Sequence, residues 1–137
     1  MRLLVVLCAV LLTAAASAAT AAQIPVRATM ATTSTKPLVD TPWRYTIVVK
    51  NRQGEPLAAK ARLQVLLGTV VVGCWKRPAL VECSGASAGT WIPFKGKRTG
   101  VLRWPEQFAR MKLTFQAIVV TGTRSLRLRA PVTPQLP

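Results

Sequence analysis

Residues 110–132 read RMKLTFQAIVVTGTRSLRLRAPV, and apolar side chains recur there at every second position on both sides of Gly122-Thr123. Strict alternation of this kind is typical of half-buried β-strands. Glycine at the first of two central positions suits a type II′ turn, which joins antiparallel strands. The stretch therefore predicts a hairpin whose inward residues are Met111, Leu113, Phe115, Ala117 and Val119 on the first strand and Leu126, Leu128, Ala130 and Val132 on the second.

The parity of these two strands also predicts their register. Inward positions are odd before the turn and even after it, so the numbers of paired residues must have an odd sum. A two-residue turn meets this condition. The expected pairs are Thr121 with Arg124 at the turn, Val119 with Leu126, Ala117 with Leu128 and Phe115 with Ala130 inside, and Gln116 with Arg129 outside.

Two longer runs upstream alternate in the same way, and Gly54 and Pro56 between them supply a turn. The inward positions are Trp43, Tyr45, Ile47 and Val49 in residues 43–51, WRYTIVVKN, and Ala61, Leu63, Val65 and Leu67 in residues 59–67, AKARLQVLL. Shorter strands are expected at residues 68–73, 89–96 and 101–104, with an N-terminal edge strand near 24–32. About seven short strands without a helix predict an all-β, antiparallel sandwich.

Three runs carry a resemblance to a known family, namely KPLVDTPWRYTIVVKNRQGEPLAAKARLQVLLGTVVVG (36–73), GTW (89–91) and MKLTFQAIVVTG (111–122). Over residues 36–133, the similarity is to the Ig-like β-sandwich domains of secreted bacterial proteins, especially those of actinobacteria. It implies an Ig-like fold and an extracellular role, and it carries over no functional residue. Residues 22–35 then form a flexible lead-in or an edge strand, and residues 134–137 a proline-rich tail.

The first 21 residues have the layout of a secretory signal peptide, with one Arg, an apolar run and then small residues. A retained membrane anchor is the alternative, but the strongly apolar part is shorter than the roughly 20 residues that a spanning helix needs. Cys8 lies in this segment and would leave with it. We therefore expect a secreted or cell-envelope protein with no membrane span in its mature chain.

The remaining cysteines bracket the stretch GCWKRPALVEC, residues 73–83. The chain has no histidine, so the ligands for a zinc site are too few. The spacing is far longer than the CxxC of a catalytic redox pair. In an oxidising compartment, Cys74 and Cys83 are expected to form a structural disulfide.

Catalysis has little support in the sequence. Without histidine, and without a free thiol once the cysteines pair, Ser-His-Asp and Cys-His mechanisms are excluded. The four acidic residues lie in predicted turns or in the disulfide loop, with no spacing that brings two of them together, and no phosphate-binding or calcium-binding motif is present. We predict that the protein is not an enzyme and uses no cofactor and no metal.

Tryptophans could form a stacking platform for sugars or bases. Trp43 is in phase with an inward face, and Trp91 is expected in a core strand, while the environment of Trp104 stays open. Trp75 lies beside Lys76 and Arg77 on the expected disulfide loop. These three residues are therefore candidate exposed contacts.

The formal charge of +15, with only four acidic residues, favours anionic partners. Parity predicts one basic sheet face built from Lys60, Arg62, Arg110, Lys112, Arg127 and Arg129, with Arg124 at the hairpin turn. We predict a non-enzymatic binding module for an anionic polymer, lipid head groups or an acidic protein, with no nucleic acid expected in vivo. The alternative is a structural or adaptor domain of an envelope assembly, in which the charge serves solubility. The oligomeric state stays open.

Overall fold

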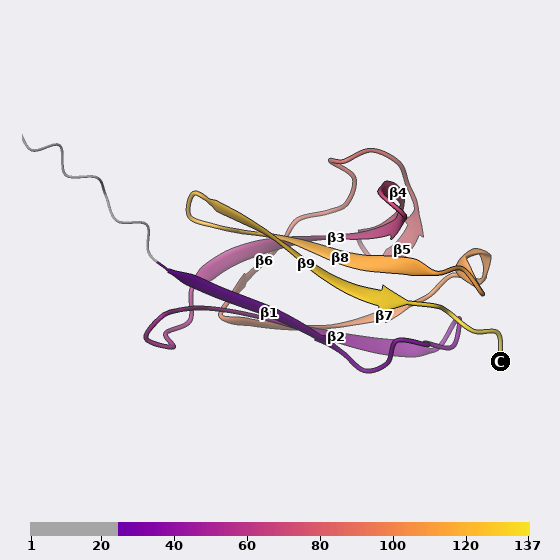
Figure 1. Ribbon diagram of the computed structural model, residues 1–137, viewed down its shortest axis with the longest axis horizontal. Coiled ribbons are helices and arrows are strands. Elements are labelled where there is room, and N and C mark those ends of the chain that lie inside the picture. Colours follow the sequence, from indigo (N-terminus) through magenta and orange to yellow (C-terminus); the bar gives the residue numbers. More distant parts are fainter. Residues whose placement is uncertain (1–24) are drawn as a thin grey trace, which may run out of the picture.

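The computed structural model describes residues 25–137, and in this part of the chain nine strands form two antiparallel sheets packed face to face (Figure 1). The expected all-β, two-sheet sandwich is confirmed. The expected signal peptide and Cys8 lie outside the described residues. The strands are β1 (Val26–Thr32), β2 (Pro42–Asn51), β3 (Ala58–Leu67), β4 (Val70–Lys76), β5 (Ala79–Glu82), β6 (Ile92–Lys95), β7 (Lys97–Arg103), β8 (Leu113–Thr121) and β9 (Arg124–Val132).

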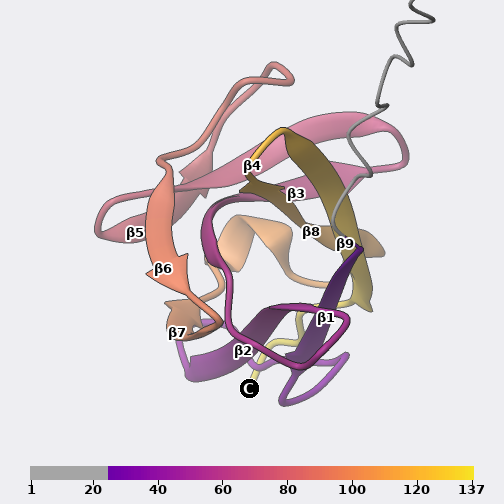
Figure 2. The ribbon, with the colours of Figure 1, turned by 90° about the vertical axis from the view of Figure 1, so that its left-hand side faces the viewer.

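The two sheets differ in size. The small sheet has the order β1-β2-β7, and the large sheet has the order β5-β4-β3-β8-β9, with β6 pairing the first half of β3. In Figure 2 the sheets are seen nearly end-on, with β1, β2 and β7 opposite β3, β8 and β9. Strands β1, β5, β6, β7 and β9 each pair with one neighbour and form the edges.

The hairpin β8–β9 has the predicted register. Phe115 pairs with Ala130 inside and Gln116 with Arg129 outside, and Thr121 stands opposite Arg124. Gly122 has a φ of 56°, which a type II′ turn requires at its first central position. Alternation along these strands was therefore sufficient to place every side chain on its face.

The core fills the space between the sheets and is rich in aromatic rings. Trp43, Tyr45, Trp104 and Phe115 are all buried, and the ring centroids of Trp43 and Phe115 are 5.1 Å apart in an edge-to-face arrangement. Edge-to-face pairs add about 0.5–1.5 kcal/mol beyond the burial of their area. The open question on Trp104 is answered, since its side chain is fully buried beside Phe108 of the short 3₁₀ turn Glu106–Phe108.

Two expectations about β3 and β7 were wrong in detail. Leu67 was expected to face the core but is 45% exposed, because the pairing of β3 with β8 ends at Leu66, one residue earlier. The strand expected at 101–104 begins at Lys97, since residues 97–103 pair continuously with β2. Pro93 lies in the edge strand β6, opposite Lys60, as suits a residue that has no backbone N–H to donate.

The disulfide segment was expected to be a loop and is instead a hairpin. The strand that begins in the valines continues past Gly73 to Lys76, and β5 returns from Ala79. Only the tip of this segment is a turn, because VVVGCWK and ALVE both extend and pair. Strand β5 is therefore the strand that the sequence did not predict, whereas β6 falls within the strand expected at 89–96.

Candidate functional site

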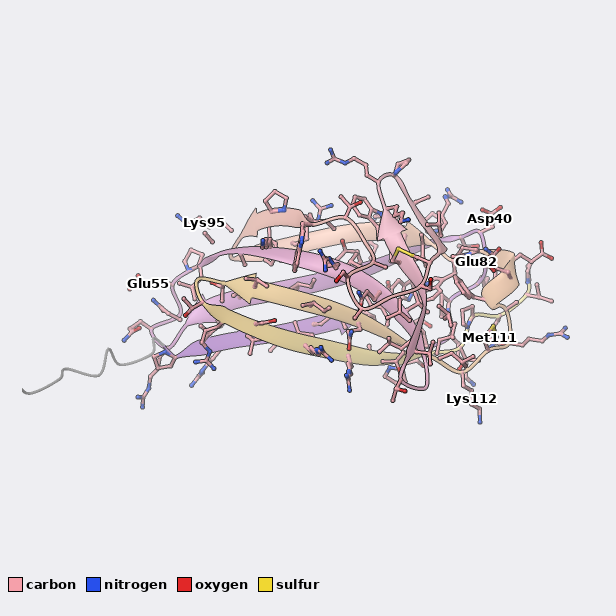
Figure 3. The ribbon with its side chains drawn as sticks, turned by 90° about the horizontal axis from the view of Figure 1, so that it is seen from above. Asp40, Glu55, Glu82, Lys95, Met111 and Lys112 are labelled. Atoms are coloured by element: carbon pink, nitrogen blue, oxygen red, sulfur yellow. A yellow bond between two sulfur atoms is a disulfide. The ribbon has the colours of Figure 1, made fainter. Side chains whose placement is uncertain are left out.

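The disulfide joins Cys74, inside β4, to Cys83, directly after β5, with Cα atoms 5.8 Å apart. The expected structural disulfide is therefore present (Figure 3). The backbone N–H of Cys83 also donates to the carbonyl of Val72 at 3.3 Å. Covalent bond and hydrogen bond together fix the point from which residues 84–91 leave the hairpin.

Residues 84–91, which we call the crossing loop, lie over the outer face of the large sheet. The loop is attached by Gln64 of β3, whose amide Nε2 donates to the carbonyls of Ala86 at 2.9 Å and Ala88 at 3.0 Å. Gly89 lies so close to β3 that an added Cβ would be 3.0 Å from Cγ of Arg62. The loop therefore shields Gln64, which is only 1% exposed although it faces away from the core.

A chain of hydrogen bonds runs from this loop across three strands. Gln64 of β3, Gln116 of β8 and Arg129 of β9 lie in one row of the sheet. Gln116 Nε2 donates to Gln64 Oε1 at 3.1 Å, and Arg129 Nε donates to Gln116 Oε1 at 2.8 Å. Since Gln64 and Gln116 are both buried, their amides hold the Arg129 guanidinium by its Nε and leave its two terminal nitrogens for other partners.

A hollow of about 260 Å³ lies beside these hydrogen-bonded side chains, on the outer face of the large sheet. Its base is made by side chains of β3, β4 and β8, its walls by the crossing loop and the β3–β4 turn, and Arg127 and Arg129 stand on its β9 side. Among residues 25–137, no Asp or Glu lines it. The lining residues are Gln64, Leu66, Gly68, Thr69, Val71, Ala86, Thr114, Gln116, Ile118, Arg127 and Arg129.

Trp91 was expected in the core and lies on the outer side, half exposed. The reason is that β6 begins at Ile92, which takes the buried position, so Trp91 still belongs to the crossing loop. The Nζ of Lys60 is 4.6 Å and the Cζ of Arg62 is 4.1 Å from the Trp91 ring centroid. Cation–π contacts therefore hold two cations on this face.

Four of the predicted basic residues come together on the outer face of the large sheet. Lys60, Arg62, Arg127 and Arg129 point outward from β3 and β9, on either side of β8. Arg62 and Arg127 occupy the same row, with Ile118 between them. We call these four residues the basic face.

The other three predicted residues lie at the ends of the hairpin. Arg124 is half-buried at the turn opposite Thr121. Arg110 and Lys112 precede β8 at the opposite end, where Figure 3 labels Lys112 beside Met111. Parity alone placed them on the face because the alternation continues for three residues beyond the paired strand.

The loop candidates are arranged differently from the expectation. Trp75 lies in β4 opposite Leu80 and is half-buried against the core, because the strand continues through it. Lys76 and Arg77 are exposed at the tip of the β4–β5 hairpin. They border a second, more open hollow of about 490 Å³ with the crossing loop.

The small sheet also carries cations on its outer side, which the predicted single face did not include. Arg27 and Lys50 stand opposite each other, and Lys97 and Arg103 belong to β7. All of these, with Arg44, are exposed. The basic residues of the domain therefore occupy both outer faces.

Further features of residues 25–137 bear on the kind of site that is present. No group of three or more Cys, Asp or Glu side chains there could hold a metal ion, and no helix there is long and apolar enough to span a membrane. Figure 3 shows Glu55 at one end of the molecule and Asp40 at the other. No protein-family model matches the sequence, and no curated protein is similar to it.

Proposed function

We propose that the chain is a secreted, non-enzymatic Ig-like β-sandwich module that binds anionic envelope polymers or acidic partners through its basic face. The observation that carries this proposal is the fixed Arg129, whose Nε is held by Gln116 on a face with three other cations. A guanidinium held in this way loses little side-chain freedom on binding. The Cys74–Cys83 disulfide and the signal-like N-terminus support an extracellular location.

Electrostatics favours a polymer over a single small ion. One exposed cation contributes little in water at physiological salt, where the Debye length is about 8 Å. Several cations that contact one polyanion act together, because each contact releases condensed counterions. Binding through the basic face should therefore weaken steeply as salt is raised.

The test is the salt dependence of binding to immobilised heparin and to polyphosphate. In Arg127→Glu/Arg129→Glu, two of the four cations of the basic face are reversed, and we expect the affinity at physiological salt to fall about tenfold or more. The matched control is Arg27→Glu/Lys50→Glu, because these two exposed cations are also neighbours on an outer face. We expect the control to lose less than about threefold.

The second candidate is a structural or adaptor domain of an envelope assembly, in which charge serves only solubility. The cations on the outer side of the small sheet favour it, since they lie away from the basic face. Equal losses in the two double variants would support this candidate. Elution of the wild-type protein at the salt expected from net charge alone would support it as well.

A further inference from the structure

We propose that the hollow beside Arg129 binds one carboxylate-bearing sugar ring, so that the polymer recognised by the basic face is an acidic glycan of the uronic-acid type. This inference rests on the proposed function and names its ligand class. It depends on three properties of the hollow: the fixed guanidinium of Arg129, the apolar side chains at its base, and the fully paired backbone of β3 and β8 beneath it.

The guanidinium supplies recognition of a carboxylate. With Nε of Arg129 engaged by Gln116, its two terminal nitrogens form a fork that matches the two oxygens of a carboxylate. Arg127 stands two residues along the same strand, about 7 Å away, and adds a second cation. Gln116 Nε2 has two hydrogens and gives one to Gln64, so it keeps a further donor at the edge of the hollow.

The base of the hollow argues against a bare phosphate. Leu66, Val71 and Ile118 present aliphatic side chains there, and the hydroxyls of Thr69 and Thr114 lie among the lining groups. A volume of about 260 Å³ is just below the range of about 300–1,000 Å³ that drug-sized ligands occupy. A sugar ring has C–H groups for the aliphatic base and hydroxyls for the threonines, whereas a phosphate would leave the apolar surface uncovered.

The surroundings of the hollow disfavour a lipid surface and a peptide. Residues of the crossing loop and of the Gly68-Thr69 turn line it, and Gln116 is only 3% exposed, so a flat layer of head groups has poor access to the Gln116 amide. Strands β3 and β8, which line the hollow, are each paired on both sides, so their backbone cannot pair with an extended peptide there. Recognition must therefore come from side chains that contact a compact group.

The experiment compares three defined probes on the oxidised protein by calorimetry: trigalacturonate, tripolyphosphate and the neutral sugar maltotriose. We expect trigalacturonate to bind at least about tenfold more tightly than either of the others. The key variant is Arg129→Lys, which keeps the charge but loses the fork and the Nε bond to Gln116. It should lower the affinity for trigalacturonate about tenfold and leave retention on immobilised polyphosphate unchanged.

A second variant, Val71→Thr, keeps the branched shape and should weaken trigalacturonate binding a few-fold by making the base of the hollow polar. Arg127→Lys, at an exposed position, provides a further test should Arg129→Lys fail to fold. The inference is overturned if tripolyphosphate binds as tightly as trigalacturonate, or if both lysine variants keep wild-type affinity for the sugar. If the wild-type protein is not retained on heparin, the proposed function itself is overturned.

Discussion

The outer faces of the two sheets carry similar charge but differ in structure. On the small sheet, Arg27, Arg44 and Lys50 project from paired strands that, among residues 25–137, no loop is known to cover. On the large sheet, the crossing loop covers part of the surface, and two buried glutamines connect it to Arg129. Composition accounts for cations on both faces, whereas only the disulfide hairpin and its loop turn one of them into a hollow with a fixed guanidinium.

The largest expected effect comes from removing the disulfide. Cys74→Ser/Cys83→Ser should lower the free energy of unfolding by about 2–3 kcal/mol, because the crosslink restricts a short segment of the unfolded chain. The strands should remain, because the backbone hydrogen bonds of the β4–β5 hairpin do not depend on the disulfide and serine is no larger than cysteine. Denaturant titration and far-UV circular dichroism measure the two quantities.

Hydrogen exchange would then show which of the two sheets is affected by this loss of stability. Backbone amides of residues 84–90 should lose protection in the double serine variant, while those of the β1–β2 pair should keep it. Equal loss of protection in both sheets would contradict the idea that the disulfide acts on the outer face of the large sheet. Two free thiols in the secreted wild-type protein, found by mass spectrometry, would remove the premise.

An intermediate effect is expected at Gln64. Gln64→Ala leaves Gln116 Nε2 and the carbonyls of Ala86 and Ala88 without their partner, so the free energy of unfolding should fall by about 1–2 kcal/mol. Gln53→Ala is the control, because its side chain is exposed in a turn, and it should change stability by less than about 0.5 kcal/mol. A loss at Gln64 no larger than at Gln53 would show that the Gln64 amide does not hold the crossing loop in place.

The sequence predicted the strands and faces well wherever alternation was long. The β8–β9 register followed from parity and one glycine, and the buried positions of β2 followed from WRYTIVVKN. Parity paired Gln116 with Arg129 on the outer face, as observed, whereas nothing in the sequence linked Gln64 to Gln116. Their contact could not be predicted, because it depends on β3 pairing β8 in one register, which brings together two residues 52 positions apart in the sequence.

The errors have a common physical origin in strand ends. Trp91 was expected inside because residues 89–96 were expected to form one core strand, but β6 begins only at Ile92. Arg110 and Lys112 were expected on the face because alternation continues before β8. The disulfide segment was expected to be a loop because its cysteines, proline and basic pair suggested one, yet backbone pairing continues through Lys76. The local sequence shows where apolar and polar residues alternate, but only the pairing between strands shows where each strand ends.

The smallest expected effect is a difference in coupling energy between one side-chain pair on each outer face. On the large sheet, Arg62 lies over the Trp91 ring, and its buried Nε has no hydrogen-bond partner among residues 25–137. A double-mutant cycle of Trp91→Ala and Arg62→Ala should give a coupling energy of about 0.5–1 kcal/mol, as expected for a partly exposed cation–π pair. On the small sheet, the hydroxyls of Thr46 and Thr99 are 3.3 Å apart, and the same cycle there should give about 0.2–0.5 kcal/mol. Thermal unfolding of the two sets of variants measures both couplings. A larger coupling at the threonines would mean that the stacked cations on Trp91 are no better fixed than ordinary surface pairs, and that the basic face owes its order to Gln116 and Arg129 alone.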